Sequence, residues 1–361
     1  AAVTTKLDLG GGRTAYAHRV TFTGLAPATS YWYRVGDGAT WSEWLRFRTA
    51  AAGPEPFRFI YVGDAQNDIR SLWSRAVREA VMAAPDARFI VSAGDLVAEG
   101  WDDALWGEWS GAQGFLAAMI PSLPSPGNHD LHKAPGDPAA KTVATVNALW
   151  RSQFTLPHNG PSGVPELADE AWFIDVQGVR IVSLDANVYA EDNFDPEFKA
   201  KAAKAQLEWL GRVLSDNPSR WTIVVHHQPV YSVGKDRDNA ELREALLPIY
   251  DRYHVDLVLQ GHDHSYGRTR KLAGGRPVAA DMPGTVYAVS VSGPKMYPLN
   301  HRFLDLMAVT KTNTQMYQVI LVAGDRLSYE AHSITGELVD AFELRKDGTG
   351  VATLVEGRVG R

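Results

Sequence analysis

The stretch Phe57-Arg58-Phe59-Ile60-Tyr61-Val62-Gly63-Asp64-Ala65-Gln66 decides the fold, because an apolar run leads directly into a glycine and a carboxylate. Short apolar runs of this kind are typical of strands that are covered on both faces. Three more of them follow, at residues 88–92, 221–225 and 255–259. The sequence therefore predicts a buried sheet between other layers of structure.

Helices and further strands are expected around these runs. Apolar residues recur with helical spacing over residues 203–214 and 242–253. Asn239 precedes the second stretch as a candidate helix cap, and Pro248 inside it disfavours its last turns. A hairpin is expected over residues 172–184, and strands are expected at 285–291, 316–322, 327–332 and 338–344. Together these segments predict an α/β fold, a mixed two-sheet sandwich flanked by helices.

The first fifty residues have a different pattern. Alternating segments at 17–22, 31–35 and 44–48 predict strands, and residues 25–35 resemble the late strands of a fibronectin type III sandwich. Such a sandwich needs about 100 residues, so only part of one is present. We expect a partial fibronectin-like β domain over residues 1–50, a linker over 51–56 and a second domain over 57–361, with a processed or truncated start because the chain opens on alanine.

Composition excludes several functions. Hydrophobic residues make up 45% and charged residues 22% of the 361, as in soluble globular proteins, and the net charge of -6 predicts neither nucleic acid binding nor attraction to anionic membranes. No apolar run reaches the roughly 18–20 residues of a membrane span. The absence of cysteine excludes disulfides, thiolate metal ligands and a cysteine nucleophile.

Polar clusters follow almost every expected buried strand. They are Gly63-Asp64, Gly94-Asp95, Gly127-Asn128-His129-Asp130, His226-His227 and Gly261-His262-Asp263-His264. Residues at the carboxyl ends of strands in α/β sheets converge in space, and glycine allows the backbone to turn sharply there. Carboxylate, amide and imidazole donors without sulfur suit manganese, iron or zinc better than calcium. The clusters therefore predict a metal site.

The order of these motifs resembles that of the calcineurin-like metallophosphoesterases and, within them, the purple acid phosphatases. The resemblance runs from Phe57 to the end of the chain, and the first segment resembles the amino-terminal domain of the same family. It implies a two-sheet αββα sandwich that hydrolyses small-molecule phosphate esters, most simply phosphomonoesters, through a hydroxide bridging two metal ions drawn from iron, manganese or zinc. It also implies a periplasmic or secreted location.

Carried over motif by motif, the resemblance assigns six metal ligands. Asp64 and His264 would bind the first ion, Asp95 would bridge both ions, and Asn128, His227 and His262 would bind the second. His227 takes this role in preference to His226 because the family's ligand lies two residues before the proline, here Pro229.

Two positions depart from the family pattern. The tyrosine that gives purple acid phosphatases their colour lies three residues after the bridging aspartate, where this chain has Ala98. Many relatives in the wider family carry a metal-binding histidine two residues after the first aspartate, where this chain has Gln66. We expect a protein without purple colour, in which Gln66 either coordinates through its amide oxygen or supports the ligands.

Further residues are expected to act around the metals. His129 follows the ligand Asn128 directly and is the candidate general acid, with Asp130 or Glu99 setting its charge state. Asp130 is also expected to support the ligands. The candidate substrate contacts are His226, Lys235 and Arg237.

Two alternatives remain at the level of sequence. One is a phosphodiesterase acting on nucleotides or phospholipid headgroups, a choice that depends on the loops at residues 133–150 and 188–196. The other is a non-catalytic module in which the fibronectin-like segment binds carbohydrate or protein, although a complete ligand set argues against a relic site.

Overall fold

The strand predicted from the opening motif is β5, Phe57–Val62, in a computed structural model that describes residues 2–134, 136, 145–191 and 195–357. It lies inside a seven-stranded sheet, parallel to β6 and antiparallel to β17. The order of this sheet is β20-β19-β18-β17-β5-β6-β7. The remaining strands are β6 (Ile90–Ser92), β7 (Ser122–Pro124), β17 (Met316–Ala323), β18 (Arg326–Ser333), β19 (Leu338–Lys346) and β20 (Ala352–Glu356).

A second seven-stranded sheet faces the first, with the order β16-β12-β15-β11-β10-β9-β8. Its central strands β9, β10, β11 and β15 are parallel, and the expected hairpin is formed by β8 and β9. The members are β8 (Trp172–Val176), β9 (Val179–Ser183), β10 (Trp221–Val225), β11 (Leu257–Gln260), β12 (Tyr266–Thr269), β15 (Val286–Val289) and β16 (Met307–Lys311). A small separate ribbon pairs β13 (Leu272–Ala273) with β14 (Arg276–Pro277).

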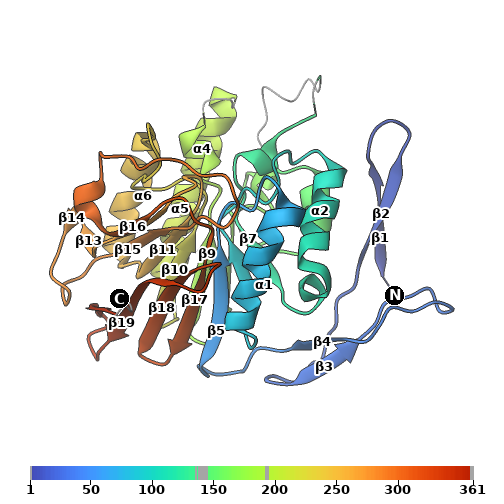
Figure 1. The fold of residues 1–361 in the computed structure, drawn as a ribbon, viewed down its shortest axis with the longest axis horizontal. Coiled ribbons are helices and arrows are strands. Elements are labelled where there is room, and N and C mark those ends of the chain that lie inside the picture. The colour runs from blue at the N-terminus through green and yellow to red at the C-terminus, as the bar shows by residue number, and fades with distance from the viewer. Residues whose placement is uncertain (1, 135, 137–144, 192–194, 358–361) are drawn as a thin grey trace.

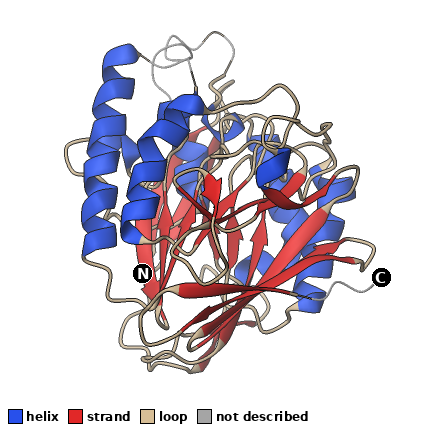
Figure 2. Cartoon of the chain, turned by 90° about the vertical axis from the view of Figure 1, so that its left-hand side faces the viewer, coloured by secondary structure: helices blue, strands red, loops and turns tan. Residues whose placement is uncertain are grey.

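Alternate residues of one strand pack into different cores, which shows that the sheet is covered on both faces. Ile223 and Val225 of β10 belong to the core that includes the space between the sheets, whereas Val224 packs with the helices outside. Tyr61 of β5 reaches across between the sheets and donates a hydrogen bond to the carbonyl oxygen of Ala288 in β15 (3.2 Å). The predicted two-sheet sandwich is therefore confirmed, and Figure 2 shows strands between helices on both outer sides.

Helices close both outer faces of the sandwich (Figure 1). They are α1 (Ser74–Ala83), α2 (Asp103–Gln113), α3 (Ala148–Gln153), α4 (Asn187–Ala190), α5 (Pro196–Ser215) and α6 (Ala240–Tyr253). The expected helices are α5 and α6, and α6 continues through Pro248 to Tyr253. Asn239 precedes α6, but its side chain does not cap the helix and donates to the carbonyl of Pro229 (2.8 Å). Single helical turns lie at Ile69–Trp73, Gly114–Ala118, His129–Leu131, Pro165–Leu167 and Leu304–Leu306.

The amino-terminal segment forms two hairpins beside the sandwich (Figure 1). The first pairs β1 (Val3–Asp8) with β2 (Thr14–Arg19), and the second pairs β3 (Ser30–Tyr33) with β4 (Leu45–Arg48). The prediction missed β1 and placed β2 three residues late. The side chains of these strands are mostly exposed, so they lack the strict alternation that a half-buried strand would show.

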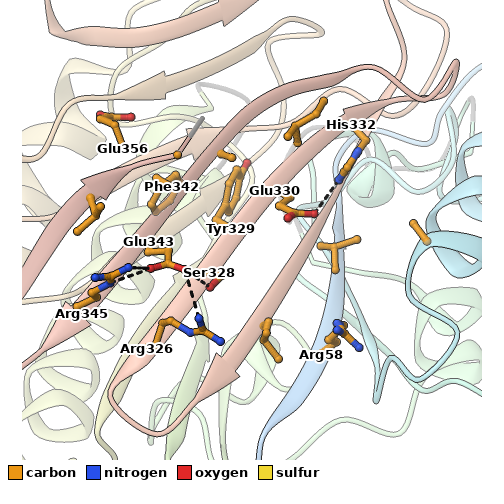
Figure 3. A pocket seen from close by; sticks show the side chains of 17 residues that line it. Arg58, Arg326, Ser328, Tyr329, Glu330, His332, Phe342, Glu343, Arg345 and Glu356 are labelled. Atoms are coloured by element: carbon orange, nitrogen blue, oxygen red, sulfur yellow. Dashed lines mark hydrogen bonds and ion pairs between the residues drawn. The ribbon is translucent and has the colours of Figure 1, made fainter. Parts of the chain in front are cut away.

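A shallow hollow of about 710 Å³ lies on the outer face of β17, β18 and β19 (Figure 3). Its walls carry Arg58, Arg326 and Arg345 together with Glu330 and Glu343, and ion pairs join Glu343 to both Arg326 and Arg345. None of the predicted metal ligands lines it. The chemistry predicted from the motifs therefore belongs elsewhere, at the carboxyl ends of the parallel strands.

Candidate metal centre

The backbone at four predicted ligands is folded into the left-handed region. The φ angles are 37° at Asp64, 52° at Asp95, 73° at His262 and 49° at His264. This conformation is unfavourable for residues with a Cβ atom, and such strain clusters at functional sites. Here it occurs in the turns that follow β5, β6 and β11. Close packing also requires glycine beside these residues, since a Cβ at Gly261 would lie 2.6 Å from Asp64 Oδ2.

The predicted ligands converge into two groups that share one residue. Asp95, His227 and His262 form one group, and Asp64, Asp95 and His264 form the other. Within each group the potential ligand atoms all lie within 4.8 Å of one another. The shared member, Asp95, is the residue expected to bridge two ions.

Hydrogen bonds orient the imidazoles of the first group. His227 Nδ1 lies 2.6 Å from the carbonyl oxygen of Ala93, which leaves Nε2 facing Asp95 Oδ2 at 3.2 Å. His262 Nδ1 lies 3.2 Å from His227 Nε2 and 3.1 Å from Asn128 Oδ1. The amide oxygen of Asn128 therefore lies beside this group, and its role as a metal ligand stays a prediction.

The second group contains a buried oxygen without a partner. Asp64 Oδ2 accepts a hydrogen bond from the backbone N–H of His262 (2.8 Å), whereas Oδ1 has no hydrogen-bond partner among the described residues and lies 3.9 Å from His264 Nε2. Gln66 donates from Nε2 to Asp95 Oδ2 (2.6 Å), and its own buried oxygen is also unpartnered. A buried carboxylate oxygen without a hydrogen bond is costly, and a cation would satisfy it. The residues present therefore fit a metal ion.

The electrostatics of the cluster favour positive charge. Burial raises the pKa of Asp64 to about 7, with its neighbour Asp95 adding to the effect. Burial alone would raise the pKa of Asp95 and lower that of His227, but their mutual attraction reverses both shifts, so that the pKa of His227 is raised to about 9 and that of Asp95 falls. The carboxylates thus hold a positive charge between them, which is what binding of a cation requires.

The predicted general acid lies at the edge of this cluster. The backbone N–H of His129 donates to Asp95 Oδ1 (2.9 Å), and its ring Nδ1 lies 2.7 Å from the carbonyl oxygen of Ala98. Because a carbonyl can only accept, Nδ1 carries a proton and Nε2 is the nitrogen that can exchange one. The ring also lies beside His132, with 4.6 Å between the ring centroids.

The expected partners of His129 have other contacts. The carboxylate of Asp130 accepts backbone N–H bonds from Leu96 (3.0 Å) and Gly127 (2.9 Å), so it fastens two ligand loops together. Glu99 binds His132 Nδ1 (3.1 Å) and Trp101 Nε1 (3.1 Å). Neither acid bonds to the His129 ring in the described residues, and the expectation that they set its charge directly is therefore corrected. Asp130 joins two of the ligand loops, and its supporting role at the metal centre stays a prediction.

Of the three expected substrate contacts, only Arg237 reaches the cluster. Its guanidinium donates to the carbonyl oxygen of His262 and lies 3.6 Å from Asp263 Oδ1. The side chain of Lys235 is 60% exposed and pairs with Asp236 (3.8 Å), so it is a solvated loop residue. His226 is fully buried and stacks near Tyr250, where burial lowers its pKa to about 3. The assignment of His226 as a substrate contact is corrected accordingly, and that of Lys235 stays a prediction.

Two residues that the sequence reading missed also lie at the cluster. Tyr297 packs edge-on against His264, with 5.0 Å between ring centroids, and the Lys295 amine lies 5.5 Å from the Tyr297 ring. Both belong to the loop after β15, where Gly293 follows a buried strand as glycine does in the recognised motifs. A glycine after a buried strand was a signal in the sequence, but no acid or histidine stands beside Gly293, so the loop did not match the other motifs.

This fold with this ligand set at the edge of its sheets is the arrangement expected for calcineurin-like metallophosphoesterases. Residues 57–266 match the family model of the calcineurin-like phosphoesterases, and residues 1–49 match that of the purple acid phosphatase N-terminal domain. The first match covers more than half of the chain, so the protein belongs to the calcineurin-like phosphoesterase family. The suggested boundaries at residues 50 and 57 stay predictions.

Curated relatives include purple and acid phosphatases. An uncharacterized protein of Mycobacterium tuberculosis is 26% identical over 325 residues, which cover 80% of this chain and 59% of that protein. Acid phosphatase type 7 of Danio rerio is 28% identical over 282 residues, covering 71% of this chain and 58% of its own. The chain therefore spans less than two thirds of these relatives.

Solved structures confirm the fold. Purple acid phosphatase PPD1 from yellow lupin (Lupinus luteus) seeds superposes with a TM-score of 0.74 at 16% identity, covering 97% of this chain and 67% of its own. The structure of PhoD gives a TM-score of 0.68 at 12% identity, covering 96% of this chain and 80% of that one.

Proposed function

We propose that the chain hydrolyses phosphomonoesters at a dinuclear metal centre whose two ions share Asp95. The observation that carries the proposal is the pair of ligand groups that overlap only at this carboxylate, next to the unpartnered oxygen of Asp64. Asp64 and His264 would hold one ion, and Asn128, His227 and His262 the other. Iron, manganese or zinc bound there would activate water and offset the charge of the phosphate.

The remaining residues bind the ester and move a proton. Arg237 offers guanidinium donors beside the turn that carries His262, a position suited to a phosphate oxygen. His129 would give the proton on Nε2 to the departing alkoxide, since Nδ1 is held by Ala98. Asp95 fixes the backbone of His129, which ties the position of the acid to the position of the ligands.

The test is to measure hydrolysis and metal content on the same sample. The purified protein is stripped with a chelator, reloaded with manganese, zinc or iron, and assayed on p-nitrophenyl phosphate and bis-p-nitrophenyl phosphate. We expect activity to return as two equivalents of metal bind and the monoester to be hydrolysed faster. Faster hydrolysis of the diester would make the protein a phosphodiesterase. Two bound equivalents without activity on any ester would favour the binding-module alternative.

The loops expected to distinguish monoesters from diesters are only partly visible. Residues 135, 137–144 and 192–194 of these loops lie outside the described residues. The preference for monoesters therefore rests on the family and not on the shape of the entrance.

A location in the periplasm or outside the cell is proposed from the same family membership. Among the helices of the described ranges, none is both long and apolar enough to cross a membrane. Fractionation of cells expressing the full-length gene, with phosphatase assays on each fraction, tests this proposal.

A further inference from the structure

The loop that carries Lys295 and Tyr297 is tied directly to the metal-ligand turns. At one end the N–H of Gly293 donates to the carbonyl oxygen of Asp64 (2.8 Å), and a Cβ at Gly293 would collide with that oxygen. At the other end the N–H of Tyr297 donates to the carbonyl of His264 (3.1 Å), and Ser265 Oγ donates to the carbonyl of Tyr297 (2.6 Å). The loop is therefore positioned by the ligand residues themselves.

Two cations lie close to the Tyr297 ring. The guanidinium carbon of Arg237 is 5.1 Å from the ring centroid, and the Lys295 amine is 5.5 Å from it. Cation–π contact is worth only about 0.5–1 kcal/mol at exposed sites and does not neutralise the charge of the cation. An anion bound near this ring would therefore be attracted by positive charge.

The carboxylate that pairs with Arg237 has other partners as well. Asp263, which lies 3.6 Å from Arg237, accepts hydrogen bonds from Ser232 Oγ (2.8 Å) and from the N–H of Gly234 (2.9 Å). No carboxylate in the described ranges forms an ion pair with Lys295, whose side chain is partly exposed. In a chain with a net charge of -6, an unpaired lysine held at the rim of the cluster is available to a ligand.

The two cations differ in their bonds to the ligand residues. Arg237 bonds to the carbonyl of His262 and so lies at the ligand turn itself. Among the described residues, Lys295 forms no hydrogen bond or ion pair with a ligand residue, and its amine lies beside the Tyr297 ring, which packs against His264. A phosphate bound at the metals would therefore meet Arg237 first, and Lys295 would face the alcohol part of the ester.

We propose that Lys295 is a specificity-determining residue that binds a second anionic group on the alcohol side of the substrate, with Tyr297 as the platform that positions its amine. This inference rests on the proposed phosphoesterase function and narrows its substrate class to esters with an additional carboxylate or phosphate. Lysine suits either group as a compact, freely rotating charge.

The experiment uses substrates that differ in the second anion alone. 3-Phosphoglycerate and glycerol 3-phosphate differ by a carboxylate in place of a hydroxymethyl group, and fructose 1,6-bisphosphate and fructose 6-phosphate differ by one phosphate. For each pair the readout is the ratio of the two kcat/KM values, measured in the metal-loaded wild type and in Lys295→Met. Lys204→Met, a 79% exposed lysine on α5, controls for the loss of one surface charge.

We expect the wild type to prefer the doubly anionic ester and Lys295→Met to lower the ratio by about tenfold or more, the value of one charge-assisted hydrogen bond. Lys295→Arg should retain most of the preference, and Lys204→Met all of it. A lower ratio for one pair alone identifies the second anion as carboxylate or phosphate. Equal losses on both members of each pair, or no loss on any, would overturn the inference.

The outcomes also separate this inference from the proposed function. Hydrolysis of glycerol 3-phosphate without preference for the second anion would leave the phosphoesterase assignment in place and remove the role of Lys295. Failure of the wild type to hydrolyse any of these esters or p-nitrophenyl phosphate would reject both.

Discussion

Asp95→Asn is the most direct test of the shared ligand. Asparagine keeps the shape of the side chain but removes the one negative charge that both ligand groups have in common. At an effective dielectric constant of about 20, two unit charges at a separation of about 4 Å contribute roughly 4 kcal/mol, and a divalent ion roughly twice that. Because about 1.4 kcal/mol corresponds to tenfold in affinity, each ion should bind more weakly by at least two to three orders of magnitude.

The assay combines metal analysis after dialysis with turnover on p-nitrophenyl phosphate. Asp130→Asn is the matched control, since Asp130 is as deeply buried and lies on a neighbouring loop but belongs to neither group. It accepts two backbone N–H bonds, and an amide offers only one acceptor oxygen, so this variant should lose about 1–3 kcal/mol of stability. We expect Asp130→Asn to keep two equivalents of metal and Asp95→Asn to lose most of them.

Turnover should fall by several orders of magnitude in Asp95→Asn, because the backbone of His129 also bonds to this carboxylate. Circular dichroism of the metal-free variants shows whether the fold is intact. Two equivalents of retained metal with near-normal turnover in Asp95→Asn would refute the assignment of the bridge.

Three further predictions follow from single residues. His129→Ala should reduce turnover on glycerol phosphate by roughly 10²–10⁴-fold and far less on p-nitrophenyl phosphate, whose leaving group needs no proton. The metal content should not change, because Asn128 and not His129 is the expected ligand. Equal losses on both substrates would make His129 a phosphate contact. With Ala98 in place of the tyrosine, iron-loaded protein should show no strong visible band, and if one appears, Tyr297→Phe tests the tyrosine beside His264 as its source. Burial raises the pKa of Asp185 to about 6 from an ordinary 3.8, so the native state binds this proton more tightly than the unfolded state does and stability falls as pH rises from about 4 through 6. In Asp185→Asn the free energy of unfolding, measured from urea unfolding curves of the metal-free protein, should fall by about 3 kcal/mol less over this pH range. An unchanged pH slope would contradict the raised pKa.

The buried strands and the ligands could be predicted from the sequence because both leave local signals. β5 and β10 have the expected bounds, since strands covered on both faces are continuous apolar runs. The motifs at the ends of the buried strands contain every member of the two potential metal-ligand groups, and Asn128 lies beside them. Trp106 and Trp109 of α2 are buried and pack against Trp150 and Phe154, so these aromatic residues outside the motifs belong to the core.

Other features depend on contacts that no local pattern reveals. His226 and His227 are adjacent and chemically identical, yet successive residues leaving a strand point to opposite sides, so one joins the ligands and the other is buried beside Tyr250. Lys235 and Lys295 look alike in the sequence, and only the fold places Lys295 beside Tyr297 and leaves Lys235 in solvent.

The left-handed backbone at the ligands links metal binding to folding. Asp64, Asp95, His262 and His264 each adopt a conformation that costs on the order of 1 kcal/mol for a residue with a Cβ atom. The same turns bury carboxylates close together, including an oxygen of Asp64 without a hydrogen bond. These costs exist only in the native state, and a bound cation offsets them there because the ligands are brought together by folding. The strand-end glycines and the strained ligands therefore work together: glycine makes room for the turn, and the ligand adopts the strained conformation that directs its donor atom to the centre.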